Sequence, residues 1–332
     1  MEVGTFRAWL LGMEALPAEQ REEVQAILHG REPGEEVTAA IEDRLLAERC
    51  CPHCGTGGAV KRGSANGLRR SRCKACSKSF NALTGTSLAR LRHKARWLEF
   101  AQALKDGDTV RASAGRCSVA VGTAFRWRHR FLQTLKTATA PLRGIVEADD
   151  AFVLDSHKGA RQLDRPARKR GGKATNRGLS RQQVPILVAA DRRGTTLSAV
   201  LPEVSATAIQ AVLAPVIDKD ALLVTDGAAV YPRCAADRGI SPEALNQSAG
   251  ERVRGDLHIQ TVNNRHQRIK AFLAPFRGIA TKYLPNDLRW FQCIGLALHP
   301  SSRACLNAAR GLQTKVAVPS ERELSLKKTS PG

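Results

Sequence analysis

The spacing of apolar residues changes along the chain and predicts several kinds of structure. In 1–48 and in 91–137 apolar residues recur every three or four positions, which predicts amphipathic helices. Short turns near Gly107 and Gly115 divide the second stretch into three helices. After residue 144, short apolar runs alternate with helical segments. This second half of the chain therefore predicts an α/β fold.

The elements expected in that half have definite bounds. Strands are predicted at 144–154, 184–190, 196–200 and 221–225, and helices at 206–217, 227–237, 259–274 and 286–297.

Residues 51–80 have almost no periodic apolar face, so something other than a hydrophobic core must hold them. Two Cys-x-x-Cys pairs lie in this segment, and 18 residues separate them. Two such turns complete a tetrahedral zinc shell, and a shell closed by four thiolates is structural rather than catalytic. The predicted Zn²⁺ ligands are Cys51, Cys54, Cys73 and Cys76. The neighbouring Cys50 and His53 could substitute for a ligand, but they are expected to be bystanders or to support the ligands from outside the shell.

The charge of the chain favours a polyanionic partner. Lys and Arg number 52 against 31 Asp and Glu, a net charge of +21. Aromatic residues are only 5% of the chain, which disfavours a base-stacking surface and favours contacts with backbone phosphates. There is no apolar run of 18 residues and no signal-peptide pattern at Met1. We expect a soluble cytoplasmic protein, associated with the nucleoid and not with a membrane.

Residues 109–130 have the pattern of a helix-turn-helix, with small residues that permit close helix crossing. The last of these helices carries Arg126, Arg128 and Arg130, which are predicted to contact double-stranded DNA. The alternative is a helical spacer whose arginines are merely solvated.

Acidic residues occupy two of the predicted strands. Glu147, Asp149 and Asp150 lie within one strand, and Asp226 ends another before a glycine turn. Carboxylates on adjacent strands can share Mg²⁺, the ion used in phosphodiester chemistry. Strand alternation places Glu147 on the same face as Asp149 and Asp150 on the opposite face. Asp149 is the preferred ligand, and Glu147 is the alternative.

The predicted helix at 259–274 contains no acid that could serve as a third ligand, and none lies between His258 and Pro285. Asn263 and Lys270 are seven residues apart, nearly two helical turns, so they project from one face. An Asn carbonyl oxygen can bind Mg²⁺, and Lys can hold a phosphate.

These motifs, in this order, resemble the bacterial insertion-sequence transposases of the family numbered fifteen-ninety-five. The resemblance covers about residues 40–300. It is carried by the four-cysteine segment, Ser79-Phe80, Gly85-Thr86-Ser87, Thr123 to His129, Glu147-Ala148-Asp149, Thr225-Asp226-Gly227, His258 to Lys270 and Phe276 to Asn286.

The resemblance implies a ribonuclease-H-like domain of the DDE class that cuts and inserts transposon ends with Mg²⁺. It implies that Asp149 and Asp226 are the two acids. In one branch of the family Asn replaces the third acid and Lys follows it, which matches Asn263 and Lys270. Asp150 stands where the family more often has Glu, so the contributions of Glu147 and Asp150 stay open.

The resulting hypothesis is an insertion-sequence transposase that joins a 3′-hydroxyl to target DNA and acts as a homo-oligomer on DNA. The alternatives are a zinc-ribbon regulator with a degenerate nuclease half and a nuclease without strand transfer. The basic insert 157–182 either clamps DNA or is a solvated loop. The expected parts are a helical segment (1–48), a zinc ribbon (49–88), a helix-turn-helix-like region (89–140), a ribonuclease-H-like domain (141–306) and a flexible tail (307–332).

Overall fold

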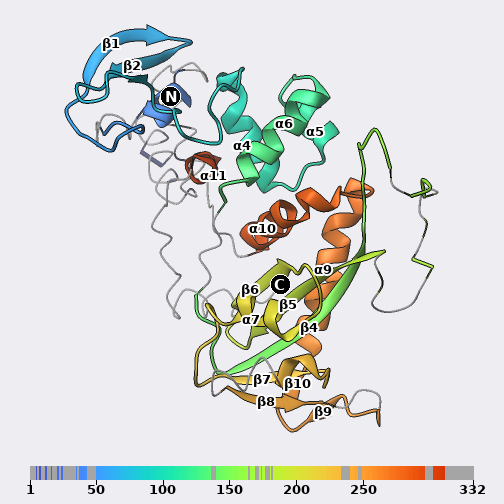
Figure 1. The fold of residues 1–332 in the computed structure, drawn as a ribbon. Coiled ribbons are helices and arrows are strands. Elements are labelled where there is room, and N and C mark those ends of the chain that lie inside the picture. The colour runs from blue at the N-terminus through green and yellow to red at the C-terminus, as the bar shows by residue number, and fades with distance from the viewer. Residues whose placement is uncertain are drawn as a thin grey trace. The chain divides into compact units, whose positions relative to one another are not determined.

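The chain forms two compact units in the computed structural model (Figure 1). The first unit combines Met1–Leu135 with Ala297–Gly332, and the second is Lys136–Leu296. The structure describes residues 50–135, 140–163, 182–232, 240–245, 249–295 and 302–310, with shorter pieces between 5 and 42 and between 165 and 180. Among these residues, no helix combines the length and the apolar composition that crossing a membrane requires.

A small antiparallel sheet follows the first cysteine pair in the first unit. Its strands are β1 (Val60–Ala65), β2 (Leu68–Arg72) and β3 (Ser79–Phe80), in the order β1-β2-β3. Asn66 and Gly67 join β1 to β2, both with positive φ. Such a two-residue Asn-Gly turn matches the twist of a β-hairpin. The Asn66-Gly67 pair is therefore a hairpin signal in the sequence, although no hairpin was predicted for 51–80.

Three helices follow, as the sequence predicted for 91–137. They are α4 (Trp97–Lys105), α5 (Val110–Arg116) and α6 (Val121–Leu132), and the short 3₁₀ helix η1 (Lys94–Arg96) precedes them. Phe100 packs edge-to-face on both Trp127 and Phe131. Edge-to-face aromatic pairs and their buried area stabilise the packing of α4 against α6.

The first unit is completed by a helix from the far end of the described chain, α11 (Ser302–Ala309). The carbonyl oxygen of Ala309 accepts hydrogen bonds from Ser87 Oγ and Thr134 Oγ1, each at 2.6 Å. The Arg310 guanidinium donates to the carbonyls of Ala40 and Ile41. The predicted boundary between a catalytic part ending at 306 and a flexible tail beginning at 307 is therefore wrong, because 302–310 belong to the first unit and 308–310 are buried in it.

The second unit is built on a five-stranded mixed sheet, which confirms the α/β class. Its strands lie in the order β6-β5-β4-β7-β8. β4 and β5 pair antiparallel, as do β5 and β6, whereas β7 is parallel to both β4 and β8. The bounds are β4 (Ile145–Leu154), β5 (Gln183–Asp191), β6 (Thr196–Val200), β7 (Leu222–Thr225) and β8 (Ser241–Ala244).

Helices cover the two faces of this sheet with separate apolar cores. On one face Val146, Ala148 and Leu223 pack with Ile209 and Leu213 of α7 (Ala206–Leu213). On the other face the sheet packs against α9 (Gln260–Leu273) and α10 (Leu284–Gly295), which Figure 1 shows in orange. A two-stranded ribbon, β9 (Val253–Arg254) and β10 (Leu257–His258), precedes α9, and the 3₁₀ turns η3 (Ala274–Phe276) and η4 (Thr281–Tyr283) follow it.

Most predicted elements of this unit are present, and the differences concern α7, β8 and the segment that follows Asp226. α7 ends at Leu213 rather than at 217, because the chain turns there through hydrogen bonds from Val216 and Ile217 back to the Leu213 carbonyl. β8 was not predicted, because its residues Ser241–Ala244 contain a proline and a glutamate and no run of apolar residues. Of the predicted helix 227–237, residues 227–229 are not helical and 230–232 are, while 233–237, like 296–297 of the helix predicted at 286–297, lie outside the described residues.

Candidate metal centres and active site

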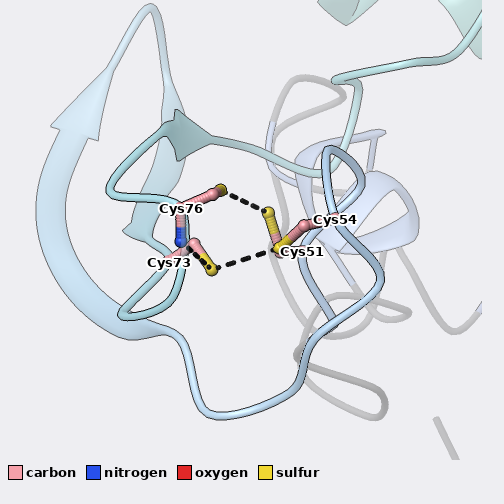
Figure 2. Close-up of side chains that lie close together, drawn as sticks. All are labelled: Cys51, Cys54, Cys73 and Cys76. Atoms are coloured by element: carbon pink, nitrogen blue, oxygen red, sulfur yellow. Dashed lines mark hydrogen bonds between the residues drawn. The ribbon is translucent and has the colours of Figure 1, made fainter.

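The four predicted cysteines converge at one point, and two loops present them from opposite sides (Figure 2). Their sulfur atoms all lie within 4.8 Å of one another. Cys51 Sγ is 3.6 Å from Cys76 Sγ, and Cys54 Sγ is 3.6 Å from Cys73 Sγ. A zinc tetrahedron with Zn–S bonds of about 2.3 Å has sulfur–sulfur edges of about 3.8 Å. The cluster therefore has the donor type and the spacing that zinc requires.

The two loops repeat one hydrogen-bonding scheme. The amides of Gly55 and Ser77 donate to the carbonyls of Cys51 and Cys73, four residues earlier in each loop. Gly55 and Ser77 both adopt the left-handed conformation, with φ of 74° and 58°. Glycine adopts this conformation without strain, whereas a serine does so only when the surrounding structure holds it.

Further hydrogen bonds reach the sulfur atoms. The amides of His53 and Cys76 donate to Cys51 Sγ and Cys73 Sγ, each at 3.4 Å. The hydrogen bond between Cys54 and the Thr56 hydroxyl lowers the pKa of Cys54 to about 6, whereas burial and the neighbouring thiols raise the pKa of Cys76 to about 11. Cys54 is thus prepared to bind a cation at neutral pH. Among the described residues, the cluster includes neither Cys50 nor His53.

Strand register brings two of the predicted acids to the same level. Glu147 on β4 pairs with Val224 on the parallel strand β7. Two residues further along each strand stand Asp149 and Asp226, and Asp226 follows directly after the end of β7. Its Oδ1 accepts from the amide of Ala228 at 3.0 Å, and Gly227 with φ of 89° completes the turn. The two acids therefore lie at the same level on the neighbouring strands β4 and β7, in the middle of β4 and where β7 ends.

Burial and neighbouring charges raise the pKa values of the two aspartates of β4. Burial, together with the charges of Asp226 and Asp150, raises the pKa of Asp149 to about 6. Burial and the charge of Asp226 also raise the pKa of Asp150 to about 6, although the Tyr231 hydroxyl opposes this shift. Mutual repulsion between buried carboxylates is the condition that a bound cation relieves.

This set of groups suits Mg²⁺ by its chemistry, because carboxylate oxygens are the hard ligands that this ion prefers. The acids converge less tightly than the thiolates. Within the described part of the chain, only the cysteines bring three or more His, Cys, Asp or Glu ligand atoms within 4.8 Å.

Asp149 and Asp150 face opposite sides of the sheet, as strand alternation predicted. Asp149 Oδ2 lies 3.9 Å from Nδ1 of His266 on α9. Asp150 faces Tyr231, which belongs to the core on the α7 side. Asp150 therefore points away from the helix that carries Asn263 and Lys270.

Asn263 and Lys270 are both on α9, and both are exposed. In the described residues, no hydrogen bond or ion pair joins either of them to Asp149 or Asp226. The α9 residue that meets Asp149 is the buried His266, which the sequence analysis did not single out. Burial lowers the pKa of His266. The helical period predicts this placement, since His266 is four residues after the buried Val262.

Glu147, the alternative metal ligand, is occupied elsewhere. Its Oε2 accepts hydrogen bonds from the amides of Thr261 and Val262 in the first turn of α9, at 2.7 and 3.0 Å. Its Oε1 lies 2.6 Å from a guanidinium nitrogen of Arg192. Oε2 thus has two hydrogen-bond partners, whereas Oε1 has an ion-pair partner but no hydrogen bond among the described residues.

The three predicted DNA-contacting arginines of α6 differ in their exposure. Arg126 is exposed. Arg128 is only 3% exposed and donates to the carbonyl of Asp108. Arg130 is half-buried and donates to the carbonyl of Ala89 at 3.3 Å. The prediction for Arg128 is therefore corrected, because a side chain buried against the α4–α5 connection cannot reach a phosphate.

Comparison with known proteins places the chain in a family. Residues 141–292 match the family model described as the ISXO2-like transposase domain. A protein of Halobacterium salinarum, described as an uncharacterized protein in transposable element ISH50, is 32% identical over 250 residues, which are 73% of this chain and 83% of that protein. The chain belongs to the ISXO2-like transposase family.

The matched span of this transposase holds Asp149, Asp226, Asn263 and Lys270, whereas the cysteine cluster lies before it. The crystal structure of a pre-cleavage Mos1 transpososome aligns with 64% of the transposase and 79% of that chain, at 14% identity and a TM-score of 0.23. Because this TM-score is so low, we infer nothing about the transposase from the alignment.

Proposed function

We propose that this transposase cleaves the ends of its insertion sequence and joins the freed 3′-hydroxyl to target DNA. The observation that carries the proposal is the placement of Asp149 beside Asp226 within the span that matches the family. Hydrolysis of one phosphodiester would release a 3′-hydroxyl. Attack of that hydroxyl on a target phosphodiester would form one phosphorus–oxygen bond and break another.

The strand order supports a ribonuclease-H-like class for the second unit. Three antiparallel strands, β4 to β6, are extended on the β4 side by two parallel strands. The two acids stand on the central pair of this arrangement, and α9 packs on the face that Asp149 occupies.

Asp149 and Asp226 would hold the divalent cation, with Asn263 proposed as the third ligand and Lys270 as the contact to the phosphate. The cation would supply Lewis-acid stabilisation of the leaving oxygen and an activated hydroxyl. The exposed Lys270 ammonium, on the same helix face as Asn263, would bind the phosphate as a point charge.

For the first unit we propose a zinc ribbon and a helix-turn-helix that together bind double-stranded DNA. The thiolate cluster and the exposed basic residues beside it on β1 and β2 support the ribbon; those residues are Lys61, Arg62, Arg69 and Arg72. The α5–α6 pair supports the helix-turn-helix. The homo-oligomer on DNA stays a prediction from the family resemblance alone.

A plasmid assay tests the proposed activity. Purified protein would be incubated with supercoiled plasmid that carries the DNA flanking its own gene, with Mg²⁺ or with EDTA. We expect Mg²⁺-dependent cuts at the element ends, followed by joined products. Specific binding without cleavage in any divalent metal would instead support the regulator, and cuts without joined strands would support the nuclease.

Replacing Arg126 by alanine should weaken DNA binding through the loss of a phosphate contact. The slope of log affinity against log salt concentration should become less negative by about 0.9, the value for one phosphate contact. Arg128→Ala is the matched comparison on the same helix. It should lower the melting temperature and leave the salt slope unchanged, because its side chain is buried. An unchanged slope for Arg126→Ala would contradict this assignment.

A further inference from the structure

We propose that Glu147 is a positioning residue of the transposase that fixes the start of α9 against the strand carrying Asp149. The inference rests on the proposed function, because α9 matters to catalysis only if its residues complete the active site. Glu147 acts through the helix and touches neither the cation nor the DNA.

The start of α9 has no capping side chain at the usual position. Its N-cap residue is Ile259, whose side chain accepts no hydrogen bond. A helix leaves its first four amides without partners inside the helix, and a neighbouring group must satisfy them. Ser, Thr, Asp or Asn at the N-cap normally does so. An isoleucine cannot, so α9 depends on groups from outside its own sequence.

Those groups account for the amides of the first turn. The Gln260 amide donates to Nδ1 of His258 at 3.2 Å. The amides of Thr261 and Val262 donate to Glu147 Oε2, at 2.7 and 3.0 Å. The Asn263 amide then makes the first bond of the helix, to the Ile259 carbonyl. Of the three amides of Gln260, Thr261 and Val262, which precede the first bond within the helix, one carboxylate from β4 thus satisfies two.

The negative charge of the Glu147 carboxylate is balanced by the neighbouring Arg192 guanidinium. The Glu147 side chain is 1% exposed, and Oε1 lies 2.6 Å from a guanidinium nitrogen of Arg192. Arg192 also donates to the Thr261 hydroxyl and to the Asp256 carbonyl. A buried carboxylate without such partners would be costly. The negative charge at the positive end of the α9 dipole adds further stabilisation.

This arrangement links the turn between β5 and β6, the β9–β10 ribbon and α9 to one residue of β4. Glu147 and Asp149 are two positions apart and face the same side of the sheet. Because Glu147 holds the first turn of α9, it determines which residues of the helix lie opposite which residues of β4. His266, one turn beyond Val262, accordingly meets Asp149.

The test compares Glu147→Gln with Asp149→Asn, Arg192→Lys and the control Glu243→Gln. Glu243 is an exposed acid of the same sheet that pairs with Arg254. Gln keeps an oxygen for the α9 amides but loses the ion pair with Arg192. Three quantities are measured on the full chain: hydrogen exchange of the α9 amides, Mn²⁺ binding by calorimetry, and Mg²⁺-dependent cleavage of element ends.

We expect Glu147→Gln to exchange the amides of the first α9 turn at least about tenfold faster and to cleave about 10 to 100 times more slowly, the range seen when partners that orient metal ligands are removed. Mn²⁺ affinity should stay within about threefold, whereas Asp149→Asn should lose Mn²⁺ binding. Arg192→Lys should shift exchange and cleavage in the same direction, and Glu243→Gln should match the wild type.

Two results would overturn the proposal. Loss of Mn²⁺ binding in Glu147→Gln, to the extent seen in Asp149→Asn, would make Glu147 a ligand. Unchanged exchange at the start of α9 would remove the positioning role, and Arg192→Lys tests the same contact if Glu147→Gln does not fold. If the wild-type chain cleaves nothing, the proposed function fails, while the exchange and Mn²⁺ data still decide the role of Glu147.

Discussion

Asp226→Asn is expected to reduce metal-dependent cleavage of the element ends by more than about 100-fold, because even the partners that orient metal ligands contribute 10- to 100-fold. The amide keeps the hydrogen bond from the Ala228 amide that forms the turn after β7. It removes the charge that Asp149 and Asp226 would share with a cation. The fold should survive, so the loss would report on chemistry.

The same variant should change the protonation of its neighbours. The charge of Asp226 contributes to the raised pKa values of Asp149 and Asp150, both about 6. Removing that charge should lower both pKa values part of the way toward that of an ordinary aspartate, since burial, and for Asp149 also the charge of Asp150, still opposes ionisation. Carboxyl carbon chemical shifts followed by NMR as a function of pH would measure this change.

Asp220→Asn is the matched control, because Asp220 is an exposed acid just before β7. It should cleave at the wild-type rate. Cleavage by Asp226→Asn within about tenfold of the wild type would contradict the assignment of Asp226 to the active site, since a difference of that size is only about 1.4 kcal/mol.

Local patterns in the sequence predicted the parts of the site that depend on one strand or one turn. The period of two along β4 placed Glu147 and Asp149 on one face and Asp150 on the other, and the contacts with α9 and Tyr231 agree. The Cys-x-x-Cys spacing likewise predicted the thiolate cluster. Such features follow from backbone geometry alone, because the strand and the tight turn fix where each side chain points.

Contacts between segments that are far apart in the sequence could not be predicted from local patterns. Glu147 lies 114 residues from the amide of Thr261 to which it is bonded, and nothing near either residue indicates the pairing. The absence of a capping residue at Ile259 was visible, but the group that replaces it was not. The packing of α11 in the first unit is a similar case, since it depends on Ser87 and Thr134, far away in sequence.

The placement of Arg128 could have been predicted. Ala124, Trp127 and Phe131 are three and four residues apart and form the buried face of α6. Arg128 follows Ala124 by four residues and therefore belongs to the same face. Its charge suggested a solvated side chain, but a helix buries an arginine when a backbone carbonyl, here that of Asp108, accepts its hydrogen bond.

Cys73→Ser is expected to abolish zinc binding, unfold the segment from Cys51 to Phe80 and weaken binding to the element ends by more than about tenfold, which corresponds to 1.4 kcal/mol. Among the described residues, the buried cluster that includes cysteines consists of Cys51, Cys73 and Phe80, with Ala59 and Cys76 partly buried against them, and Leu68 of β2 is also buried. So small a core cannot order the segment without metal, whose binding energy in small zinc domains is about 10 to 16 kcal/mol. The basic residues of β1 and β2 would then lose their fixed arrangement.

Metal analysis, hydrogen exchange over 51–80 and a band-shift titration would measure the three effects. Cys50→Ser is the matched control, because Cys50 is exposed and adjacent to the cluster but outside it. It should keep one zinc per chain and wild-type affinity. A Cys73→Ser protein that retained stoichiometric zinc and the exchange pattern of the wild type would show that this cysteine is not a ligand. If it lost zinc but still bound the element ends with wild-type affinity, the cysteine segment would have no part in binding the element ends, and α5 and α6 would have to account for that binding.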